Sequence, residues 1–147
     1  MFKKILIVCT GNICRSPAAE GLLKHYLKES HPDIIIQSAG THALVNRPAD
    51  PHTLDILRER DIDVTAHRAR QLKHELIGWS DLILVMDKSH LKEVETQFPT
   101  ARGKVICVGK WKNTEIPDPH RQPKAVFVEA IELIDACLKD WLSHVWS

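Results

Sequence analysis

The sequence lacks the features that mark membrane proteins and general nucleic acid binders. Its 20 basic and 19 acidic residues give a formal net charge of +1, so no excess of positive charge attracts anionic polymers or lipid surfaces. No apolar run approaches the ~20 residues of a membrane span, and the run after Lys3 and Lys4 is too short for a signal peptide. We therefore expect no nucleic acid partner and no membrane insertion, and we expect a local site to carry the function.

Cysteines are few, and their spacing matches neither a disulfide framework nor a metal-binding knuckle. The four are Cys9, Cys14, Cys107 and Cys137, with no C-x-x-C pair among them. Free thiols of this kind are typical of a reducing compartment, which predicts a cytoplasmic location. The nine histidines show no ligand spacing either. We therefore expect neither a metal ion nor a cofactor.

The length and composition predict one α/β domain over residues 1–147. With 44% hydrophobic and 27% charged residues, the composition is ordinary for a globular protein. Short apolar runs predict strands at residues 5–8, 34–36, 82–86 and 105–108, the second of which ends at Ser38-Ala39-Gly40. Apolar spacing predicts helices at 16–30, from 50 onward, at 71–78, 89–98 and 125–145, with a loop at 109–123. Ser16 is expected to be the N-cap of the first helix, with Pro17 at its first position.

The alternation of strands and helices predicts the topology. Such an alternation forms a parallel sheet covered by helices on both faces, a three-layer α/β/α arrangement. Right-handed crossovers make 2-1-3-4 the simplest order for the expected four strands. Ligands in these folds bind beyond the carboxyl ends of the strands, at the point where the strand order reverses. That point lies at the end of the first strand, where Cys9 stands.

The segment from Cys9 to Arg15 joins the first strand to the first helix and predicts a phosphate-binding loop. Successive backbone N–H groups at a helix N-terminus can surround an anion, and the helix dipole adds to the attraction. Gly11 and Asn12 suit the left-handed backbone conformations that such a bend requires. The expected phosphate-binding residues are Thr10, Gly11, Asn12, Ile13, Cys14, Arg15 and Ser16.

The side chains of this loop predict nucleophilic phosphoryl transfer without a metal. Helix N-termini and nearby cations favour the nucleophilic thiolate form of a cysteine, which makes Cys9 the candidate nucleophile. The planar fork of Arg15 can hold two phosphoryl oxygens, and Ser16 can donate its hydroxyl to the thiolate. Asp118, on the long loop after the last strand, is the candidate proton donor for a leaving phenolate. On local sequence alone, an ordinary Asp-Pro turn is the simpler explanation of Asp118, and a small buried cysteine is the alternative for Cys9.

Five motifs together resemble the low-molecular-weight protein tyrosine phosphatases. They are CTGNICRS at residues 9–16, SAGT at 38–41, HRARQL at 67–72, DLILVMD at 81–87 and DP at 118–119. The resemblance covers essentially the whole chain. The stretch GKWKNTEIPDP at residues 109–119 is most similar to the bacterial branch that is paired with autophosphorylating tyrosine kinases of capsule and exopolysaccharide export.

The resemblance implies a protein-tyrosine-phosphatase that hydrolyses phosphotyrosine and small aryl phosphates. By this resemblance, Cys9 forms a phosphocysteine intermediate, Arg15 binds the phosphoryl oxygens and Ser16 assists the thiolate. Asp118 protonates the leaving group and then activates the hydrolytic water. The implied partner is a phosphotyrosine protein, such as an autophosphorylated bacterial tyrosine kinase in exopolysaccharide production.

The resemblance also implies supporting and substrate-facing residues. Asn12, Ser38 and His67 match the family's hydrogen-bond network that holds the phosphate-binding loop in shape. Leu44 and His120 match positions at the substrate entrance. Both depart from relatives, since many carry tyrosine in place of His120 and animal relatives place an aromatic residue at the position of Leu44. We therefore expect weaker stacking on an aryl substrate.

Three alternative functions fit parts of the pattern. A protein-arginine phosphatase branch is similar but carries threonine where this chain has Ile13. Thioredoxin-coupled arsenate reductases share the fold and need two further cysteines close together on a mobile segment. Here Cys107 lies in an expected strand and Cys137 in an expected helix. The non-enzymatic alternative is a phosphate-binding or redox-sensing module that uses Cys9 and Cys14.

Overall fold

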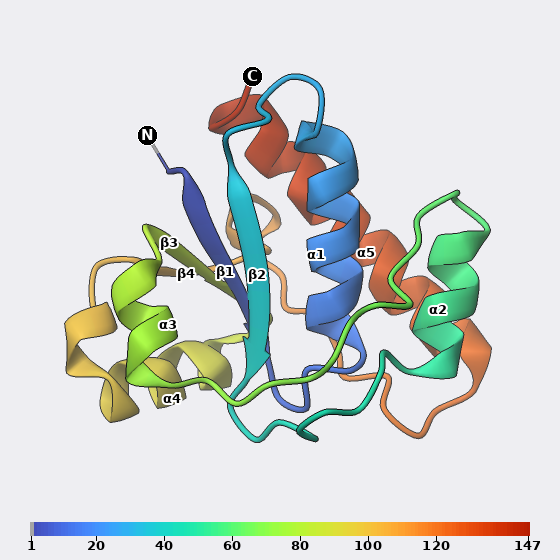
Figure 1. Cartoon of the computed structure of the whole chain (residues 1–147), viewed down its shortest axis with the longest axis horizontal. Helices are drawn as coiled ribbons and strands as arrows, with labels where there is room; N and C mark the ends of the chain where they lie inside the picture. The colour runs from blue at the N-terminus through green and yellow to red at the C-terminus, as the bar shows by residue number, and fades with distance from the viewer. Residues whose placement is uncertain (1) are drawn as a thin grey trace.

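The computed structural model describes residues 2–147, in which strands and helices alternate along the chain (Figure 1). The strands are β1 (Lys4–Cys9), β2 (Ile35–Gly40), β3 (Leu82–Val85) and β4 (Val105–Cys107). The α-helices are α1 (Arg15–Leu27), α2 (Pro51–Arg58), α3 (His74–Trp79), α4 (Lys88–Gln97) and α5 (Lys124–His144). Two 3-10 helices, η1 (Pro99–Ala101) and η2 (Lys110–Lys112), complete the regular structure of these residues. Met1, the first residue of the expected domain, lies outside the described residues.

The four strands form one parallel sheet in the order β2-β1-β3-β4, which confirms the predicted topology. The chain leaves β1 for β2 on one side and later returns to β3 on the other, so the strand order reverses at β1. Cys9, the last residue of β1, pairs with Gly40, the last residue of β2. The loops that follow these two strands therefore meet at one edge of the sheet, at the bottom of Figure 1.

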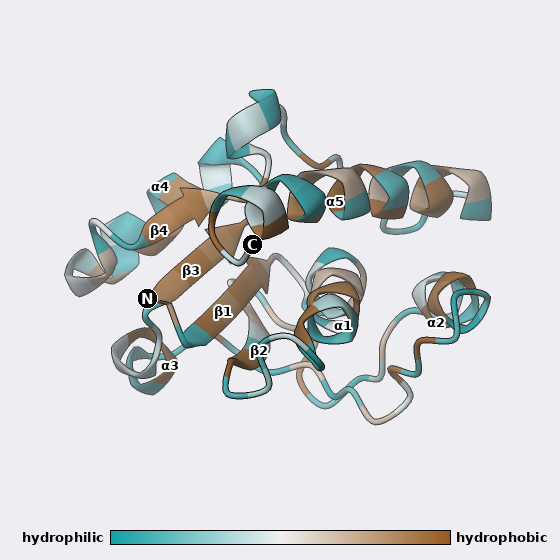
Figure 2. Cartoon of the chain, turned by 90° about the horizontal axis from the view of Figure 1, so that it is seen from above, coloured by the Kyte–Doolittle hydropathy of each residue, from teal (hydrophilic) through white to brown (hydrophobic). Residues whose placement is uncertain are grey.

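Both faces of the sheet are buried, because side chains alternate along each strand. Ile5 and Ile7 belong to the core under α1, α2 and α5, whereas Leu6 and Val8 belong to the core under α3 and α4. All four are completely buried. Figure 2 shows these two groups of helices on opposite sides of the sheet, whose strands are mostly hydrophobic. Burial of each such side chain contributes roughly 1.5–3 kcal/mol, so the two cores hold β1 firmly in place.

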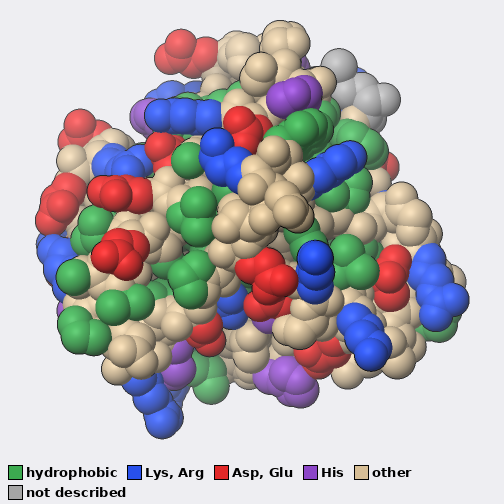
Figure 3. All heavy atoms as spheres, turned by 180° about the vertical axis from the view of Figure 1, so that it is seen from behind, with side chains coloured by type: hydrophobic (Ala, Val, Ile, Leu, Met, Phe, Trp, Pro, Cys, Tyr) green, Lys and Arg blue, Asp and Glu red, His purple; other side chains and the backbone are tan. Residues whose placement is uncertain are grey.

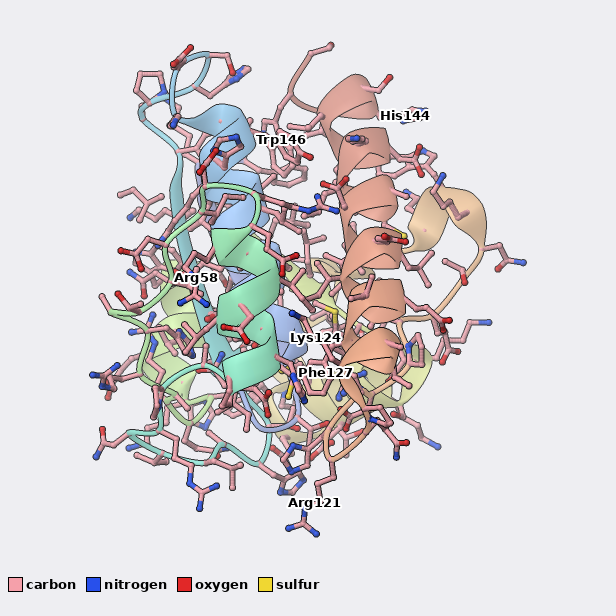
Figure 4. All side chains as sticks on the ribbon, turned by 90° about the vertical axis from the view of Figure 1, so that its right-hand side faces the viewer. Arg58, Arg121, Lys124, Phe127, His144 and Trp146 are labelled. Atoms are coloured by element: carbon pink, nitrogen blue, oxygen red, sulfur yellow. The ribbon has the colours of Figure 1, made fainter. Side chains whose placement is uncertain are left out.

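Aromatic residues of α5 contact the rest of the molecule near both ends of the segment that precedes the helix. The indole N–H of Trp141 donates to the backbone oxygen of Val108 at 2.9 Å, directly after β4. Phe127 lies between α5 and α2, with its ring centroid 4.9 Å from that of His52 (Figure 4). These contacts hold both ends of the long segment between β4 and α5. That segment contains η2 where the sequence predicts an uninterrupted loop.

The first helix begins at Arg15, one residue before Ser16, which the sequence predicts as the N-cap. Arg15 is already helical and Cys14 is the N-cap, so the prediction of Ser16 as the cap and Pro17 as the first helical residue is wrong. The physical reason is that the hydroxyl of Ser16 lies 2.9 Å from the sulfur of Cys9 and does not turn to the backbone N–H groups of the helix.

The second strand ends at Gly40, as predicted, and its polar end pairs with β1 as far as Cys9. The third helix begins at His74 and not near Gln71, because Gln71 forms a parallel bridge with Gly40. Both features bring polar residues to the carboxyl edge of the sheet.

The surface carries mixed charges. Figure 3 shows basic and acidic side chains interspersed over the face opposite to that of Figure 1, as expected from the small net charge. Among the helices of residues 2–147, none combines the length and the apolar composition required to cross a membrane.

We expect Gly40→Ala to destabilise the protein. A Cβ atom at this position would collide with the backbone oxygen of Thr10 and lie 3.1 Å from the backbone nitrogen of Asn12. Overpacking of this kind costs about 1–3 kcal/mol, which urea denaturation followed by circular dichroism measures as a lower free energy of unfolding. Gly78→Ala is the matched control, because nothing lies within 4 Å of its added Cβ. Equal stabilities of the two variants would contradict the close packing at Gly40.

Candidate active site

The loop between β1 and α1 is shaped by hydrogen bonds from outside it. Every backbone oxygen from Cys9 to Cys14 accepts a hydrogen bond from a neighbouring segment. The donors, in chain order, are the N–H groups of Thr41, His42 and Leu44, the ring of His67, the N–H of Asp50 and the hydroxyl of Thr53, at 2.6 to 3.3 Å. These donors come from residues after β2, from α2 and from the segment before α3, so several elements hold the loop from outside.

The orientation of the carbonyl groups determines the orientation of the N–H groups. In a planar trans peptide, the N–H points away from the preceding C=O, and residues 2–147 contain no cis peptide. The N–H groups of residues 10–15 therefore point toward the interior of the loop, where they form a concave anion site at the N-terminus of α1. Asn12 has the expected left-handed backbone, with φ of 61°, but the same prediction for Gly11 is wrong.

The buried side chain of Asn12 ties the loop to the two elements beside it. Its amide nitrogen donates to the hydroxyl oxygens of Ser16 and Ser38, at 2.7 and 3.0 Å. Its oxygen accepts from the backbone N–H of Arg70 at 2.9 Å. Ser38 in turn donates to the carboxylate of Glu20 at 2.5 Å. The structure thus places Ser38, like His67, in contact with Asn12. No sequence pattern singles out Glu20.

Cys9 lies at the base of the loop with its sulfur 2.9 Å from the hydroxyl oxygen of Ser16. That oxygen already accepts the N–H of Asn12, so the hydroxyl hydrogen is free to point at the sulfur. This contact places a hydrogen-bond donor beside the sulfur. The side chain is 2% exposed, so a reacting group reaches it only through the loop opening.

Arg15 connects the loop to the second half of the chain. Its guanidinium is 3% exposed and donates to the backbone oxygen of Ile116 at 2.9 Å. One nitrogen lies 3.4 Å from the hydroxyl of Thr10 and 3.6 Å from a carboxylate oxygen of Asp118. The other lies 3.6 Å from Asp87. Two carboxylates and a carbonyl thus orient the guanidinium, and Asp118 lies beside it although the two are far apart in sequence.

Asp87 and His90 also lie at the site, and of these two only Asp87 belongs to a motif found in the sequence, DLILVMD. His90 lies with its Nε2 at 2.8 Å from the hydroxyl of Thr10 and its Nδ1 at 3.3 Å from Asp87. Burial lowers the pKa of His90, although the neighbouring carboxylate works against this shift. Burial favours the neutral acid at Asp87, but hydrogen bonds from the His90 N–H and the Ser89 hydroxyl outweigh it and lower its pKa. The available signal is the position of Asp87 after β3, next to β1.

A pocket of about 150 Å³ opens over the sulfur of Cys9. Its lining consists of Cys9, Thr10, Gly11, Ile13, Cys14, Arg15, His42, Leu44, Asp118 and His120. Leu44 and His120 therefore line the pocket, whereas Asn12 and Ser16 do not. His42 is an additional lining residue. Asp118 is exposed, and one of its oxygens accepts the N–H of His120 at 3.0 Å.

Among residues 2–147, one group of side chains has a geometry that could hold a metal ion. Cys14, Asp50 and His120 have their ligand atoms within 4.8 Å of one another. They lie beside the pocket and come from three distant parts of the chain, which is why no ligand spacing in the sequence predicts them.

Known proteins resemble the chain over nearly all of its length. The low molecular weight protein-tyrosine-phosphatase Wzb of Escherichia coli (strain K12) is 42% identical over 142 residues, which cover 96% of this chain and 94% of the relative. The solved structure of Vibrio vulnificus Wzb in complex with benzylphosphonate is 40% identical, with a TM-score of 0.92. It covers 99% of this chain and 100% of that chain.

An arginine phosphatase is also similar, at lower identity. The YwlE arginine phosphatase of Geobacillus stearothermophilus is 31% identical and has a TM-score of 0.85, covering 96% of both chains. The comparisons therefore favour a tyrosine phosphatase over this alternative. The family model for low molecular weight phosphotyrosine protein phosphatase matches residues 4–146. The chain belongs to the low molecular weight phosphotyrosine protein phosphatase family.

Proposed function

We propose that this chain hydrolyses phosphotyrosine in proteins, and small aryl phosphates, through a phosphocysteine intermediate on Cys9. One observation carries the proposal. The sulfur of Cys9 lies beneath a loop whose outward-held carbonyl groups leave six N–H groups, those of residues 10–15, directed inward. A phosphoryl group in this loop meets N–H donors and a nucleophile together. The Vibrio vulnificus relative was solved with benzylphosphonate, which likewise joins a tetrahedral oxyanion to an aromatic ring.

In the first step, the thiolate of Cys9 attacks phosphorus and the bond to the phenolic oxygen breaks. The N–H groups of the loop and the guanidinium of Arg15 stabilise the charge on the three phosphoryl oxygens. A phenol has a pKa of ~10 and is a poor leaving group as an anion, so Asp118 donates a proton to it. Asp118 is exposed at the mouth of the pocket, where a departing phenol would lie.

In the second step, water attacks the phosphocysteine and the sulfur leaves as a thiolate. Asp118, now a carboxylate, accepts a proton from the attacking water. The hydroxyl of Ser16 stabilises the departing sulfur through the contact at 2.9 Å. Phosphate is released, and the thiolate of Cys9 is ready for another turnover. Asp87 stays beside the guanidinium of Arg15 throughout and keeps its orientation.

The pocket walls suit an aryl group that is held without strong stacking. Ile13 and Leu44 supply apolar surface, and His42 and His120 are the imidazole side chains of the lining. The branched apolar Ile13 favours a phenyl ring over the charged guanidinium of phosphoarginine. Cys107 and Cys137 lie on β4 and α5, and neither lines the pocket. This placement does not favour the relay of thiols that an arsenate reductase needs.

The proposed partner is a phosphotyrosine protein, and an autophosphorylated bacterial tyrosine kinase of exopolysaccharide or capsule production is the specific candidate. This proposal is supported by the 42% identity to Escherichia coli Wzb and by the resemblance of residues 109–119 to that bacterial branch. We further propose that residues 1–147 act as one catalytic domain in the cytoplasm, with no metal requirement for turnover.

We predict that Cys9→Ser abolishes turnover and retains vanadate binding. A hydroxyl is a far weaker nucleophile than a thiolate, whereas the loop N–H groups and Arg15 remain in place. Hydrolysis of an aryl phosphate measures the first effect, and isothermal titration calorimetry with vanadate measures the second. Cys107→Ser is the control, since this half-buried cysteine lies outside the pocket, and it retains turnover. Turnover of Cys9→Ser near the parental rate would exclude the phosphocysteine mechanism.

We predict that Asp118→Asn slows phosphorylation of the enzyme by phosphotyrosine about 10²–10⁴-fold, the usual contribution of general acid catalysis. The effect is much smaller with nitrophenyl phosphate, because its leaving group needs little protonation. Single-turnover kinetics with both substrates separates this step from hydrolysis of the intermediate.

Asp63→Asn is the matched control for Asp118→Asn. Each aspartate accepts a backbone N–H two residues further on, but Asp63 lies outside the pocket. We expect Asp63→Asn to keep the parental rates with both substrates. Equal losses for the two substrates in Asp118→Asn would show that Asp118 is a turn residue and that another group supplies the proton.

A further inference from the structure

The side chains of Cys14, Asp50 and His120 form a cluster beside the pocket. The proposed hydrolysis gives this cluster no common role. Cys14 Sγ lies 3.9 Å from His120 Nδ1, and a carboxylate oxygen of Asp50 lies within 4.8 Å of both. Cys14 is 5% exposed, and Asp50 and His120 are half-buried. The cluster is thus partly enclosed by protein.

The donor atoms match the preferences of zinc. A thiolate, an imidazole nitrogen and a carboxylate oxygen are the three protein ligands that Zn²⁺ uses, and a tetrahedral site with three of them leaves one position for water. Zn–S and Zn–N bonds of about 2.3 and 2.0–2.1 Å place sulfur and nitrogen about 3.5 Å apart in a tetrahedron. The observed separation of 3.9 Å closes by a small rotation of the side chain of His120.

Two of the three ligands lie at helix N-termini that hydrogen bonds hold in place. Cys14 is the N-cap of α1, and its backbone oxygen accepts the hydroxyl of Thr53. Asp50 is the N-cap of α2, and its backbone N–H donates to Ile13. One carboxylate oxygen of Asp50 caps the N–H of His52 at 2.9 Å, which leaves the second oxygen for a metal. The site is therefore largely assembled before any ion arrives.

The surroundings of Cys14 attract a cation. A carboxylate oxygen of Asp50 lies within 4.8 Å of the sulfur and of the imidazole nitrogen, and Asp118 lines the same pocket, so negative charge surrounds the cluster. Burial raises the pKa of the Cys14 thiol, so the ion has to displace a proton. Binding of the ion releases the thiol proton to solvent.

We propose that Cys14, Asp50 and His120 form a zinc site whose occupation inhibits the enzyme. Cys14 belongs to the phosphate-binding loop, and His120 belongs to the segment that carries Asp118, whose oxygen accepts the His120 N–H. An ion that bridges Cys14 and His120 joins two segments that both line the pocket. Aryl phosphates then reach Cys9 more slowly, and Asp118 loses its freedom to follow the leaving group.

The binding test uses Co²⁺ as a spectroscopic probe in the Cys9→Ser variant, which has no reactive thiolate. We expect one Co²⁺ per chain, with a thiolate-to-cobalt charge-transfer absorption that added Zn²⁺ abolishes. His120→Tyr and Asp50→Asn, each in the Cys9→Ser background, weaken binding at least 10–100-fold, the scale on which loss of even an outer-shell partner acts. Asparagine at position 50 still caps α2, so this variant keeps the fold.

Arg121→Asn is the matched control, because Arg121 is exposed and points away from the molecule next to His120 (Figure 4). It leaves cobalt binding unchanged. Loss of the charge-transfer absorption in Cys9→Ser alone would show that the metal binds Cys9, and retention of full affinity in His120→Tyr would remove His120 from the site. Either result overturns the proposal, and neither depends on catalytic activity.

The inhibition test compares zinc dose-response curves of the protein with an active Cys9, each normalised to its own rate without metal. We expect His120→Tyr and Asp50→Asn to shift the half-inhibitory zinc concentration upward by the same factor that they reduce binding. Identical curves for the parent and both variants would show that occupation of the site does not inhibit.

Discussion

The hydrogen bonds that turn the carbonyl groups of residues 9–14 outward are the constraint on which the active site depends. A loop of this length has many accessible conformations, and most of them would direct some carbonyl oxygens into the anion site. Each outward hydrogen bond excludes the conformations in which that carbonyl oxygen points into the anion site. The inward N–H groups therefore make the loop attractive to an anion without a lysine. The small net charge of the whole molecule agrees with this.

The guanidinium of Arg15 is the second constraint, and it couples catalysis to packing. A buried cation is stable only when its donors are satisfied and its charge is balanced. Here Ile116 supplies a carbonyl and two carboxylates supply charge. A phosphoryl group that enters the loop adds further negative charge on the open side. The arginine thus lines the pocket while a carbonyl and two carboxylates hold its orientation.

Local patterns in the sequence were sufficient for the topology, whereas the candidate role of Asp118 depends on the family resemblance. Apolar runs identified all four strands, and the strand-loop-helix motif placed Cys9 and Arg15 at the point where the strand order reverses. The prediction of Ser16 as the N-cap of α1 is wrong, because a tertiary contact of Ser16 with Cys9 overrides the local capping preference. No local pattern identifies the contacts that Thr53, Asp50 and His90 make with the loop. These contacts exist only after α2 and α4 have docked.

The contact between Arg15 and Ile116 spans 101 positions of the chain. On the ribosome, β1, β2 and α1 emerge long before the segment that contains Ile116 and Asp118. A domain generally folds as a unit, so Arg15 gains its carbonyl partner only once the segment that contains Ile116 has left the ribosome. Competence for turnover therefore arises late in translation, when the last strand and the following loop have joined the sheet.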